Sequence, residues 1–523
     1  MPTEPRSPIS IRDAYVRGDE AIASFLGGAP ARLWNKPPAT AKIDRRLAAE
    51  IAEYNVSAGG HRPDLTVPLA IISTGHQPTL YTGPLYTVYK AITAIQAAKR
   101  IEEKHGVRCI PLFWIAGDDH DLEEAGTVHV LTKKNEVHAL QYAPENVEGR
   151  PLDNVHLDAS LEAQAKELAT IVPGSEHRDD VLDALLDSLK NAASMTEWMA
   201  RLLARLFRDT PLVLFAPSIP RARELAADII RQEIELPLES AQRVNAGGAA
   251  LDALGFTAQV VKGETDCNFF LDVEGFRRKV SYQDNAFTAA DSDVRCTKDE
   301  LLAELEANPA RFSPNVILRC VVQQHLFPTA AYIAGPGEIA YWAQLKTVFE
   351  QFNVPMPVVY PRSSAVLTTI KLNKLLKKYS LTPAQLGQDP DRLVEHALAA
   401  ESKNPVMDAL AQTRETVNQA LGELSTSTAK LAPNATDAAG RLAERTSSEF
   451  DRMERALLRA DDQKVATVRQ QIERLCNALA PKRKPQERMY TVFTYLFDQG
   501  WDFIPRLLQE LDVDEFGLQE IEL

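Results

Sequence analysis

Short, wholly apolar runs are the first pattern along the chain. Leu69–Ile72 and Cys109–Ile115 are such runs, and a helical pattern fills the chain between them to about residue 104. Strands that are apolar on both faces are typical of parallel sheets, in which a strand–helix–strand unit makes a right-handed crossover. Further strands of this kind are expected at residues 211–215, 331–334 and 357–360. The pattern predicts an α/β core with a parallel sheet over residues 66–400.

Two stretches of mixed pattern interrupt this core and predict inserted segments. The first covers about residues 126–210, where short strands precede two helical patterns. The second covers about residues 255–310, where alternating segments such as 257–260 and 268–271 indicate antiparallel strands. Residues 1–65 look helical and irregular, and we expect them to pack on the core.

From about residue 401 the pattern changes to a heptad seam. Eight positions form this seam, in alternating steps of three and four residues, and they are Met407, Leu410, Arg414, Val417, Leu421, Leu424, Thr428 and Leu431. Six of the eight are apolar, which is typical of a coiled coil. Ala432-Pro433-Asn434 breaks the seam, and a second helix extends to about residue 479. The pattern predicts an antiparallel coiled-coil hairpin over residues 401–480, whose outer face can dimerise, and a helical segment over 481–523.

Length and hydropathy restrict the class of protein. A chain of 523 residues exceeds one ordinary hydrophobic core, which favours two to four domains. No apolar run reaches the roughly 18 residues that a membrane helix needs, and the first residues are too polar for a secretion signal. We therefore expect a cytoplasmic protein that does not bind a membrane.

Charge and cysteine content argue against further classes. The net charge is −14, whereas a protein that binds duplex nucleic acid usually carries a basic face; the longest basic cluster is the short run Lys482–Lys484. The five cysteines are odd in number and form no CxxC pair, which argues against a disulfide framework and a structural zinc site. We expect no nucleic-acid partner and no structural zinc site, and we assign no residue as a metal ligand.

The first candidate site follows the first apolar strand. Thr74-Gly75-His76-Gln77-Pro78-Thr79 is followed by Tyr81-Thr82-Gly83-Pro84. Glycines let the backbone approach a ligand closely, and Pro84 suits the first turn of a helix, whose free N–H groups favour anions. His76 can donate to a phosphate or a developing charge. Such a loop suits a nucleotide phosphate or a substrate carboxylate, although a turn with a hydrogen-bonded histidine would show the same pattern.

An acid-rich segment, Ala116-Gly117-Asp118-Asp119-His120-Asp121-Leu122-Glu123-Glu124, follows the second apolar strand. Carboxylates so close to one another raise one another's pKa unless a cation or hydrogen-bond donors compensate. A substrate ammonium group or a divalent metal would compensate, and Asp119, His120 or Asp121 could act as a base toward an attacking amine. The alternative is an acidic helix start that the helix dipole stabilises.

Two more turns follow later strands. Gly335-Pro336-Gly337-Glu338 opens a helix that carries Tyr341 and Trp342, and its backbone amides could bind an anion while the aromatic rings stack on a ligand or pack in the core. Arg362 and Ser363 follow the last strand, and Arg362 is either an anion clamp or a member of a surface ion pair. Because ligands bind beyond the carboxyl ends of parallel strands, all four turns are predicted to enclose one cavity.

Five strings resemble the cysteine-adding enzymes of bacillithiol synthesis, the BshC family. They are, in order, TGHQPTLYTGPLYTVYK, PLFWIAGDDHDLEE, AYIAGPGEIAYWAQLK, PVVYPRSS and QERMY, and they extend over about residues 70–500. The resemblance implies a Rossmann-like core similar to class I nucleotidyltransferases and aminoacyl-tRNA synthetases, with inserted connective segments and a coiled-coil arm that dimerises. The sequence departs from the HxGH signature of class I adenylating enzymes, since Ser73 replaces the first histidine and no KMSKS-like loop is evident.

The resemblance implies a ligase that couples L-cysteine to the amine of glucosaminyl-malate, in the last step of bacillithiol synthesis. Amide formation from a free carboxylate is uphill in water, so ATP or another nucleotide is expected to activate the cysteine as an acyl-adenylate or acyl-phosphate, with or without Mg²⁺. On this hypothesis the catalytic residues are His76, Asp119, His120 and Asp121. The binding residues would be Thr74, Gly75, Gln77, Thr82, Gly83, Asp118, Gly335, Gly337, Glu338, Tyr341, Arg362 and Ser363.

Two other interpretations stay open. The acidic cluster 118–124 could serve a nucleotidyltransferase or a metal-dependent hydrolase. No Walker sequence, Rossmann glycine fingerprint, GxSxG elbow or HExxH motif is present, which argues against the commonest NTPases, dehydrogenases, hydrolases and zinc proteases but leaves ATP use open. The chain could also be a non-catalytic scaffold whose coiled coil is the working part.

Overall fold

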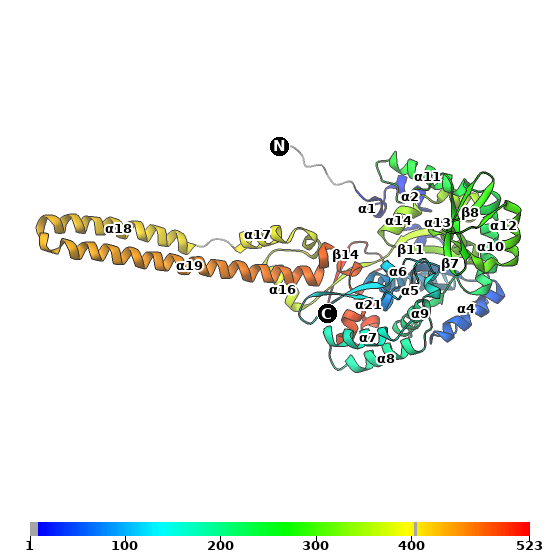
Figure 1. Ribbon diagram of the computed structural model, residues 1–523, viewed down its shortest axis with the longest axis horizontal. Coiled ribbons are helices and arrows are strands. Elements are labelled where there is room, and N and C mark those ends of the chain that lie inside the picture. The colour runs from blue at the N-terminus through cyan, green and yellow to red at the C-terminus, as the bar shows by residue number, and fades with distance from the viewer. Residues whose placement is uncertain (1–8, 402–404) are drawn as a thin grey trace. The chain divides into compact units, whose positions relative to one another are not determined.

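The computed structural model describes residues 9–401 and 405–523, which form two compact units (Figure 1). Among the described residues, the first unit comprises residues 9–366 and 487–521, and the second comprises residues 367–401, 405–486 and 522–523. Within the described residues, none of the helices combines the length and the apolarity that a bilayer crossing requires.

A five-stranded sheet forms the centre of the first unit. Its strands lie in the order β12-β11-β1-β2-β5. They are β1 (Ala70–His76), β2 (Cys109–Ile115), β5 (Val213–Phe215), β11 (Thr329–Ala334) and β12 (Val358–Pro361). Every neighbouring pair in this sheet is parallel. The α/β class and the parallel sheet that the apolar runs predicted are therefore confirmed.

Burial on both faces explains why these strands are apolar at nearly every position. Ile71 of β1 packs into one core layer, whereas its neighbours Ala70 and Ile72 pack into another layer together with Ala97 of α5 (Leu85–His105). Successive side chains of a strand point to opposite faces, so both layers demand apolar residues. Helix α5 joins β1 to β2 and contacts both, and it is therefore buried along much of its length.

The first insertion lies between β2 and β5. It contains α6 (Leu122–Ala125), β3 (Thr127–Leu131), β4 (Val137–Gln141), α7 (Ser160–Ile171), α8 (Arg178–Lys190) and α9 (Met195–Leu206). The expectation of two helical patterns before residue 210 was wrong, because three helices follow the β3–β4 hairpin. Ser194 separates the last two: its side chain accepts from the N–H of Glu197 and so caps the start of α9.

The second insertion lies between β5 and β11 and contains an antiparallel sheet in the order β10-β6-β7-β8-β9. Its elements are α10 (Pro220–Glu235), α11 (Glu239–Asp252), β6 (Asp266–Val273), β7 (Phe276–Gln283), β8 (Ala286–Ala289), β9 (Arg295–Cys296), α12 (Lys298–Ala307), β10 (Phe312–Pro314) and α13 (Val316–Leu326). The strand predicted at 268–271 is confirmed, but the one at 257–260 was wrong. The N–H groups of Gln259 and Val260 both donate to Oε1 of Gln344, at 2.9 Å each. One side-chain amide thus takes the place of a partner strand.

The remaining helices of the first unit come from both ends of the chain and from the segment after β11. They are α1 (Ile11–Val16), α2 (Glu20–Phe25), α3 (Arg32–Asn35), α4 (Arg45–Ser57), α14 (Pro336–Trp342), α15 (Lys346–Gln351), α20 (Phe493–Gln499) and α21 (Phe503–Glu510). Helices α1 and α2 bury Tyr15 and Ile22 in the main core layer. The carboxyl-terminal segment also contains the strand β14 (Leu518–Glu522), which its helical and then acidic pattern did not predict.

The second unit contains two long helices, α18 (Pro405–Leu431) and α19 (Thr436–Leu479), which run side by side as the predicted hairpin (Figure 1). Arg414, a polar member of the predicted seam, donates to Asp451 at 2.6 Å and to Glu454 at 3.1 Å across the hairpin. An ion pair therefore replaces apolar packing at that seam position. The unit also holds α16 (Ile370–Lys378) and α17 (Pro390–Glu401), and β13 (Ser364–Thr368) spans the junction of the two units in sequence.

Gly75 provides a test of how closely β1 packs on β2. A Cβ atom at this position would lie 2.6 Å from the backbone carbonyl oxygen of Trp114, which cannot move aside cheaply. Gly75→Ala is expected to lower the melting temperature of the protein by roughly 3 °C or more, because overpacking a core costs about 1–3 kcal/mol. In the matched control Gly337→Ala, the added Cβ meets no atom within 4 Å. Equal melting temperatures for the two variants, measured by scanning calorimetry, would contradict this packing.

Candidate functional site

The four predicted turns lie at one edge of the central sheet, because β1, β2, β11 and β12 are parallel and end there. Their side chains line three pockets rather than the single cavity that the sequence predicted. The acid-rich segment divides them: Asp118 lines one pocket, Glu123 a second and Glu124 a third. Glu123 and Glu124 face different pockets because consecutive residues of a helix point about 100° apart. Asp118 precedes the helix and pairs with Arg223.

The His76 pocket has a volume of about 490 Å³ and is lined by His76 of the first glycine turn and by the predicted residues of the Gly335–Gly337 turn. Its lining residues are His76, Tyr86, Lys90, Glu124, Gln259, Val260, Val316, Gly335, Pro336, Gly337, Glu338, Tyr341, Arg362 and Arg488. The structure therefore brings together six predicted residues from β1, β11 and β12, namely His76, Gly335, Gly337, Glu338, Tyr341 and Arg362.

A buried ion pair joins the two central turns of the His76 pocket. The Nζ atom of Lys90, on α5, lies 2.6 Å from Oε2 of Glu338 and donates to the backbone oxygen of Gly75 at 2.8 Å. Glu338 also accepts from the N–H of Gly335 at 2.7 Å and from the hydroxyl of Tyr332 at 2.6 Å. Burial raises the pKa of Glu338, but the combined effect of Lys90 and these donors is larger and in the opposite direction, so the pKa is lowered overall.

His76 is neutral in this environment. Burial, together with the positive charge of Lys90, lowers the pKa of His76 from 6.5 to about 3, although Glu338 opposes the shift. Its Nε2 atom lies 3.3 Å from the hydroxyl oxygen of Tyr86. The ring can therefore exchange hydrogen bonds with a ligand without carrying a charge.

Most of the hydrogen-bond donors of Arg362 are used by acceptors within the protein. Its two terminal nitrogens donate to Glu487, at 2.9 and 2.6 Å, and Nη1 also donates to the backbone oxygen of Ser363. Its buried Nε atom has no hydrogen-bond partner among the described residues. Arg488, the next residue after Glu487, is exposed and lines the same pocket. The exposed cation of this wall is thus Arg488, which sequence analysis missed.

The Asp118 pocket is smaller, at about 340 Å³, and two of its charged residues, Asp118 and Arg223, pair with each other. The Asp118 carboxylate forms a buried ion pair with Arg223 of α10. Asp153 lies beside it, and burial followed by the charge of Asp118 raises the pKa of Asp153. Gly117 is tightly enclosed, because a Cβ there would lie within 2.6 Å of the side chains of Asp153 and Thr196. For Asp118, therefore, a protein arginine supplies the compensation that the acid-rich segment requires.

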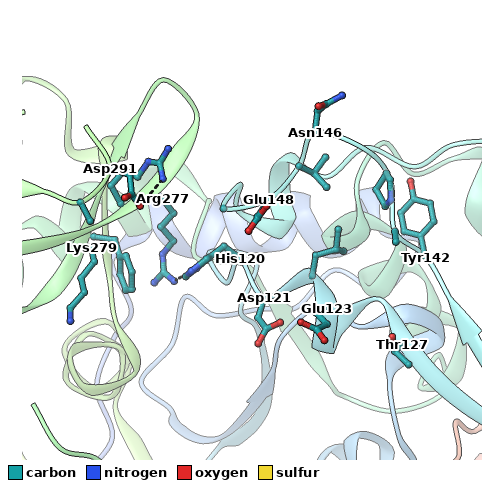
Figure 2. A pocket seen from close by; sticks show the side chains of 18 of the residues that line it. His120, Asp121, Glu123, Thr127, Tyr142, Asn146, Glu148, Arg277, Lys279 and Asp291 are labelled. Atoms are coloured by element: carbon teal, nitrogen blue, oxygen red, sulfur yellow. Dashed lines mark hydrogen bonds and ion pairs between the residues drawn. The ribbon is translucent and has the colours of Figure 1, made fainter. Parts of the chain in front are cut away.

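The His120 pocket is the largest, at about 1060 Å³, and is shown in Figure 2. Nη1 of Arg277, on β7, lies 3.3 Å from Nδ1 of His120. A guanidinium group can only donate, so Nδ1 accepts and the neutral ring carries its proton on Nε2. Burial and then the charge of Arg277 lower the pKa of His120, whereas Asp119 and Asp121 raise it to a smaller extent. His120 is therefore a hydrogen-bond donor toward the pocket.

The other predicted residues shape the backbone rather than line these pockets. They are Thr74, Gly75, Gln77, Thr82, Gly83, Asp119 and Ser363. The Thr74 hydroxyl donates to the backbone oxygen of Ile333, and the Ser363 hydroxyl donates to that of Asp512. Asp119 accepts from the N–H groups of the two residues that follow it. These residues therefore stabilise the turns at the sheet edge and do not line the pockets themselves.

Sequence analysis predicted Arg362 but missed other cations in each of the three pockets. Lys90 had a local signal, since it is a lone charge in the apolar stretch Val88–Ile95, and it lies one helical turn from Tyr86. Arg223, Arg277 and Arg488 had none, because they come from distant segments and only the fold brings them to the sheet edge. Among residues 9–401 and 405–523, no group of three or more His, Cys, Asp or Glu side chains is arranged to hold a metal ion.

Fold and site together define the class of protein: a Rossmann-like α/β protein with pockets at the carboxyl edge of its sheet and a coiled-coil second unit. Residues 66–363 match the model of the N-terminal Rossmann-like domain of bacillithiol biosynthesis BshC, and residues 365–523 match that of its C-terminal coiled-coil domain. The chain belongs to the BshC family.

Three relatives illustrate this membership, and each is named "Putative cysteine ligase BshC". The relative from Salinibacter ruber is 33% identical over 522 residues, which cover 95% of this chain and 92% of the relative. The relative from Bacillus cereus strain B4264 is 28% identical over 473 residues, with 88% of each chain covered. That from Desulforamulus reducens is 27% identical over 453 residues, which cover 85% of this chain and 82% of the relative.

The Lys90–Glu338 pair is expected to be coupled in stability. Lys90→Met would leave the Glu338 carboxylate buried without its cation and should lower the free energy of unfolding by about 3–5 kcal/mol. The double variant Lys90→Met/Glu338→Gln removes that stranded charge and should recover at least half of the loss. Guanidinium denaturation of the wild type, Lys90→Met, Glu338→Gln and the double variant completes a double-mutant cycle, which measures the coupling. Additive losses in the double variant would contradict the ion pair.

His76 is expected to make stability depend on pH. Its pKa is about 6.5 in the unfolded chain and about 3 in the folded protein. Between these values the unfolded chain binds a proton that the folded protein does not. The free energy of unfolding should therefore fall as the pH falls, by up to about 1.4 kcal/mol per pH unit from this group.

The comparison that isolates this effect is between the wild type and His76→Gln at pH 7, 6 and 5. Carboxylates titrate in both proteins, so the difference in their free energies of unfolding reports on His76. The wild type should lose more stability than the variant over this range. Parallel pH profiles would show that His76 is not buried in its neutral form.

Proposed function

We propose that this protein is a ligase that joins L-cysteine to the amine of glucosaminyl-malate, in the last step of bacillithiol synthesis. The observation that carries the proposal is a pair of pockets on either side of α6, one small and one large, at the ligand-binding edge of a BshC-family sheet. A two-substrate condensation needs two neighbouring sites. The names of the relatives support cysteine as one of the substrates.

We place cysteine in the His76 pocket. Its exposed wall presents the carboxylate of Glu124 and the guanidinium of Arg488, and neither forms an ion pair in the described part of the chain. A zwitterionic amino acid offers a matching ammonium and carboxylate group, and charge-assisted hydrogen bonds are the stronger kind. Neutral His76 and the hydroxyl of Tyr86 provide polar contacts that do not repel either charge.

We also propose that a nucleotide, ATP or another, binds here, since activating the cysteine carboxylate is the chemistry that it would supply. The residues present fit an anion. The Gly335–Gly337 turn is open on one side, because a Cβ on Gly337 would meet no atom within 4 Å. Arg488 and the unpartnered Nε of Arg362 add positive charge. Mg²⁺ would enter with the phosphates, and phosphate oxygens and water would supply most of its ligands.

His120 and Asp121 are proposed to assist the attack of the amine. His120 offers Nε2–H to a developing negative charge, because Arg277 occupies Nδ1. Asp121 uses Oδ1 to accept from the N–H of Glu124, and its other oxygen can take a proton from the amine. Asp119 is tied to its own turn and is proposed to position this pair rather than to touch substrate.

The coiled-coil hairpin is proposed to mediate a homodimer. In the described residues of α18 and α19, the side chains of Leu424, Leu442 and Met453 are each 47% exposed, and Leu431 is 86% exposed. Large apolar side chains that recur along helices and remain exposed are typical of helix–helix interfaces between chains.

Incubation of the purified protein with ATP, Mg²⁺, L-cysteine and glucosaminyl-malate is the direct test. Mass spectrometry should detect the amide, whose mass is the sum of the two substrates minus one water. Release of AMP and pyrophosphate would indicate adenylation of the carboxylate, and release of ADP and phosphate would indicate phosphorylation. Failure to form the amide with any nucleoside triphosphate supplied would refute the proposed function.

The variant Arg488→Gln tests whether the His76 pocket takes part in this reaction. Loss of the exposed cation should lower kcat/KM by about 10–100-fold. Arg295→Gln, at an exposed cation on β9 away from the three pockets, is the matched control and should retain wild-type kcat/KM. Equal kinetics for the two variants would remove the His76 pocket from the reaction.

A further inference from the structure

The His120 pocket has walls of opposite charge. One wall is β7, which contributes the consecutive cations Arg277, Arg278 and Lys279. The other contributes the carboxylates of Asp121 and Glu123, which lie across the pocket from Arg277 in Figure 2, with His120 between them. A pocket divided in this way selects for a ligand with opposite charges at its two ends.

The acidic wall lacks cationic partners of its own. Asp121, Glu123 and Glu148 all line the pocket, and none of them forms an ion pair with another described residue. Each is solvent-exposed. Their mutual repulsion would therefore be relieved by a cationic or proton-donating group of a ligand.

The basic wall is fixed in place but keeps donors available. Arg277 stacks on Phe270 with its guanidinium carbon 3.7 Å from the ring centre, and it donates to Ser313 and to the backbone oxygen of Pro314. Burial lowers the pKa of Arg277 to about 10, so it remains a cation at neutral pH. Such a rigid guanidinium loses little freedom when it binds a carboxylate.

Arg278 is the cation that a ligand can engage most easily. Its only ion pair among the described residues is with Asp291, at 3.4 Å, and Asp291 is 84% exposed. Exposed pairs of this length contribute little energy, so a ligand carboxylate can replace Asp291. Lys279 differs, because its Nζ lies 2.6 Å from Asp266, outside the pocket.

We propose that the His120 pocket is the acceptor subsite, and that it binds a small molecule with carboxylates at one end, against Arg277 and Arg278, and an amine at the other, against Asp121 and Glu123. This inference rests on the proposed function and adds to it the location and the orientation of the second substrate. The volume of about 1060 Å³ exceeds what cysteine needs and suits a sugar-sized ligand. The amine end lies at α6, where Glu123 faces this pocket and Glu124 faces the His76 pocket.

The experiment uses two probes, glucosaminyl-malate and methyl glucosaminide, which share the amine but differ in the carboxylates. Calorimetry with the full-length protein measures the dissociation constant of each probe, and steady-state kinetics measures the KM of each substrate. Arg278→Gln should raise the dissociation constant of glucosaminyl-malate about tenfold and leave that of methyl glucosaminide unchanged. Glu123→Gln should weaken the binding of both probes, because both carry the amine.

Two control variants sharpen the test. Asp291→Asn frees Arg278 from its protein partner and should leave binding of glucosaminyl-malate unchanged or make it tighter. Glu145→Gln changes an exposed carboxylate in the same loop as Glu148 but outside the pocket, and should leave both probes unaffected. The KM for cysteine should stay at its wild-type value in Arg278→Gln.

The outcomes separate this inference from the proposed function. If Arg278→Gln weakens both probes equally, or neither of them, the assignment of the pocket is overturned even when the amide is formed. If glucosaminyl-malate binds in an Arg278-dependent manner but no amide forms, the pocket assignment stands and the ligase function falls. A rise in the KM for cysteine alone would place the donor rather than the acceptor in this pocket.

Discussion

The buried pair of Lys90 and Glu338 is the interaction on which the arrangement of the site depends. The β1 turn and the β11 turn come from chain segments more than two hundred residues apart, and Lys90 binds the backbone of one and the carboxylate that caps the other. Removing two charges from water is costly, and the pair is tolerated because further donors satisfy Glu338. Burial is the larger cause of the lowered pKa of His76 and the charge of Lys90 the second, so the pair contributes to the electrostatics of the pocket as well as to its geometry.

The short helix α6 and the residues just before it divide this edge of the sheet into separate pockets. Parallel strands bring their carboxyl ends together, and a single cavity would be the simplest result. The acid-rich segment after β2 prevents it, because Asp118 turns toward Arg223 and the two glutamates of α6 face different pockets. The two larger pockets therefore meet at α6, which contributes Glu123 to one and Glu124 to the other.

The acid-rich segment shows how compensation differs from residue to residue. Asp118 is neutralised by a protein arginine, Asp119 by backbone donors, and Asp121 and Glu123 by no cation in the described residues. Desolvation of an unpaired charge is expensive, so only exposed carboxylates can remain uncompensated. Asp121 and Glu123 remain and face the largest of the three pockets, whereas Glu124 remains and faces the His76 pocket. At both places a ligand can supply the missing positive charge.

The sequence by itself determined the parallel core, the antiparallel insertion and the coiled-coil hairpin, because apolar periodicity is a local consequence of which faces are buried. It also placed His76, Gly335 and Arg362 at one sheet edge, since parallel strands must end together. Only the tertiary structure decided that Arg362 donates to Glu487 and that Arg277 donates to His120. It also decided that the side chains line three pockets where the sequence predicted a single cavity. These outcomes depend on side chains from distant segments, whose meeting has no signature in local pattern because Coulomb and packing forces act through space and not along the chain.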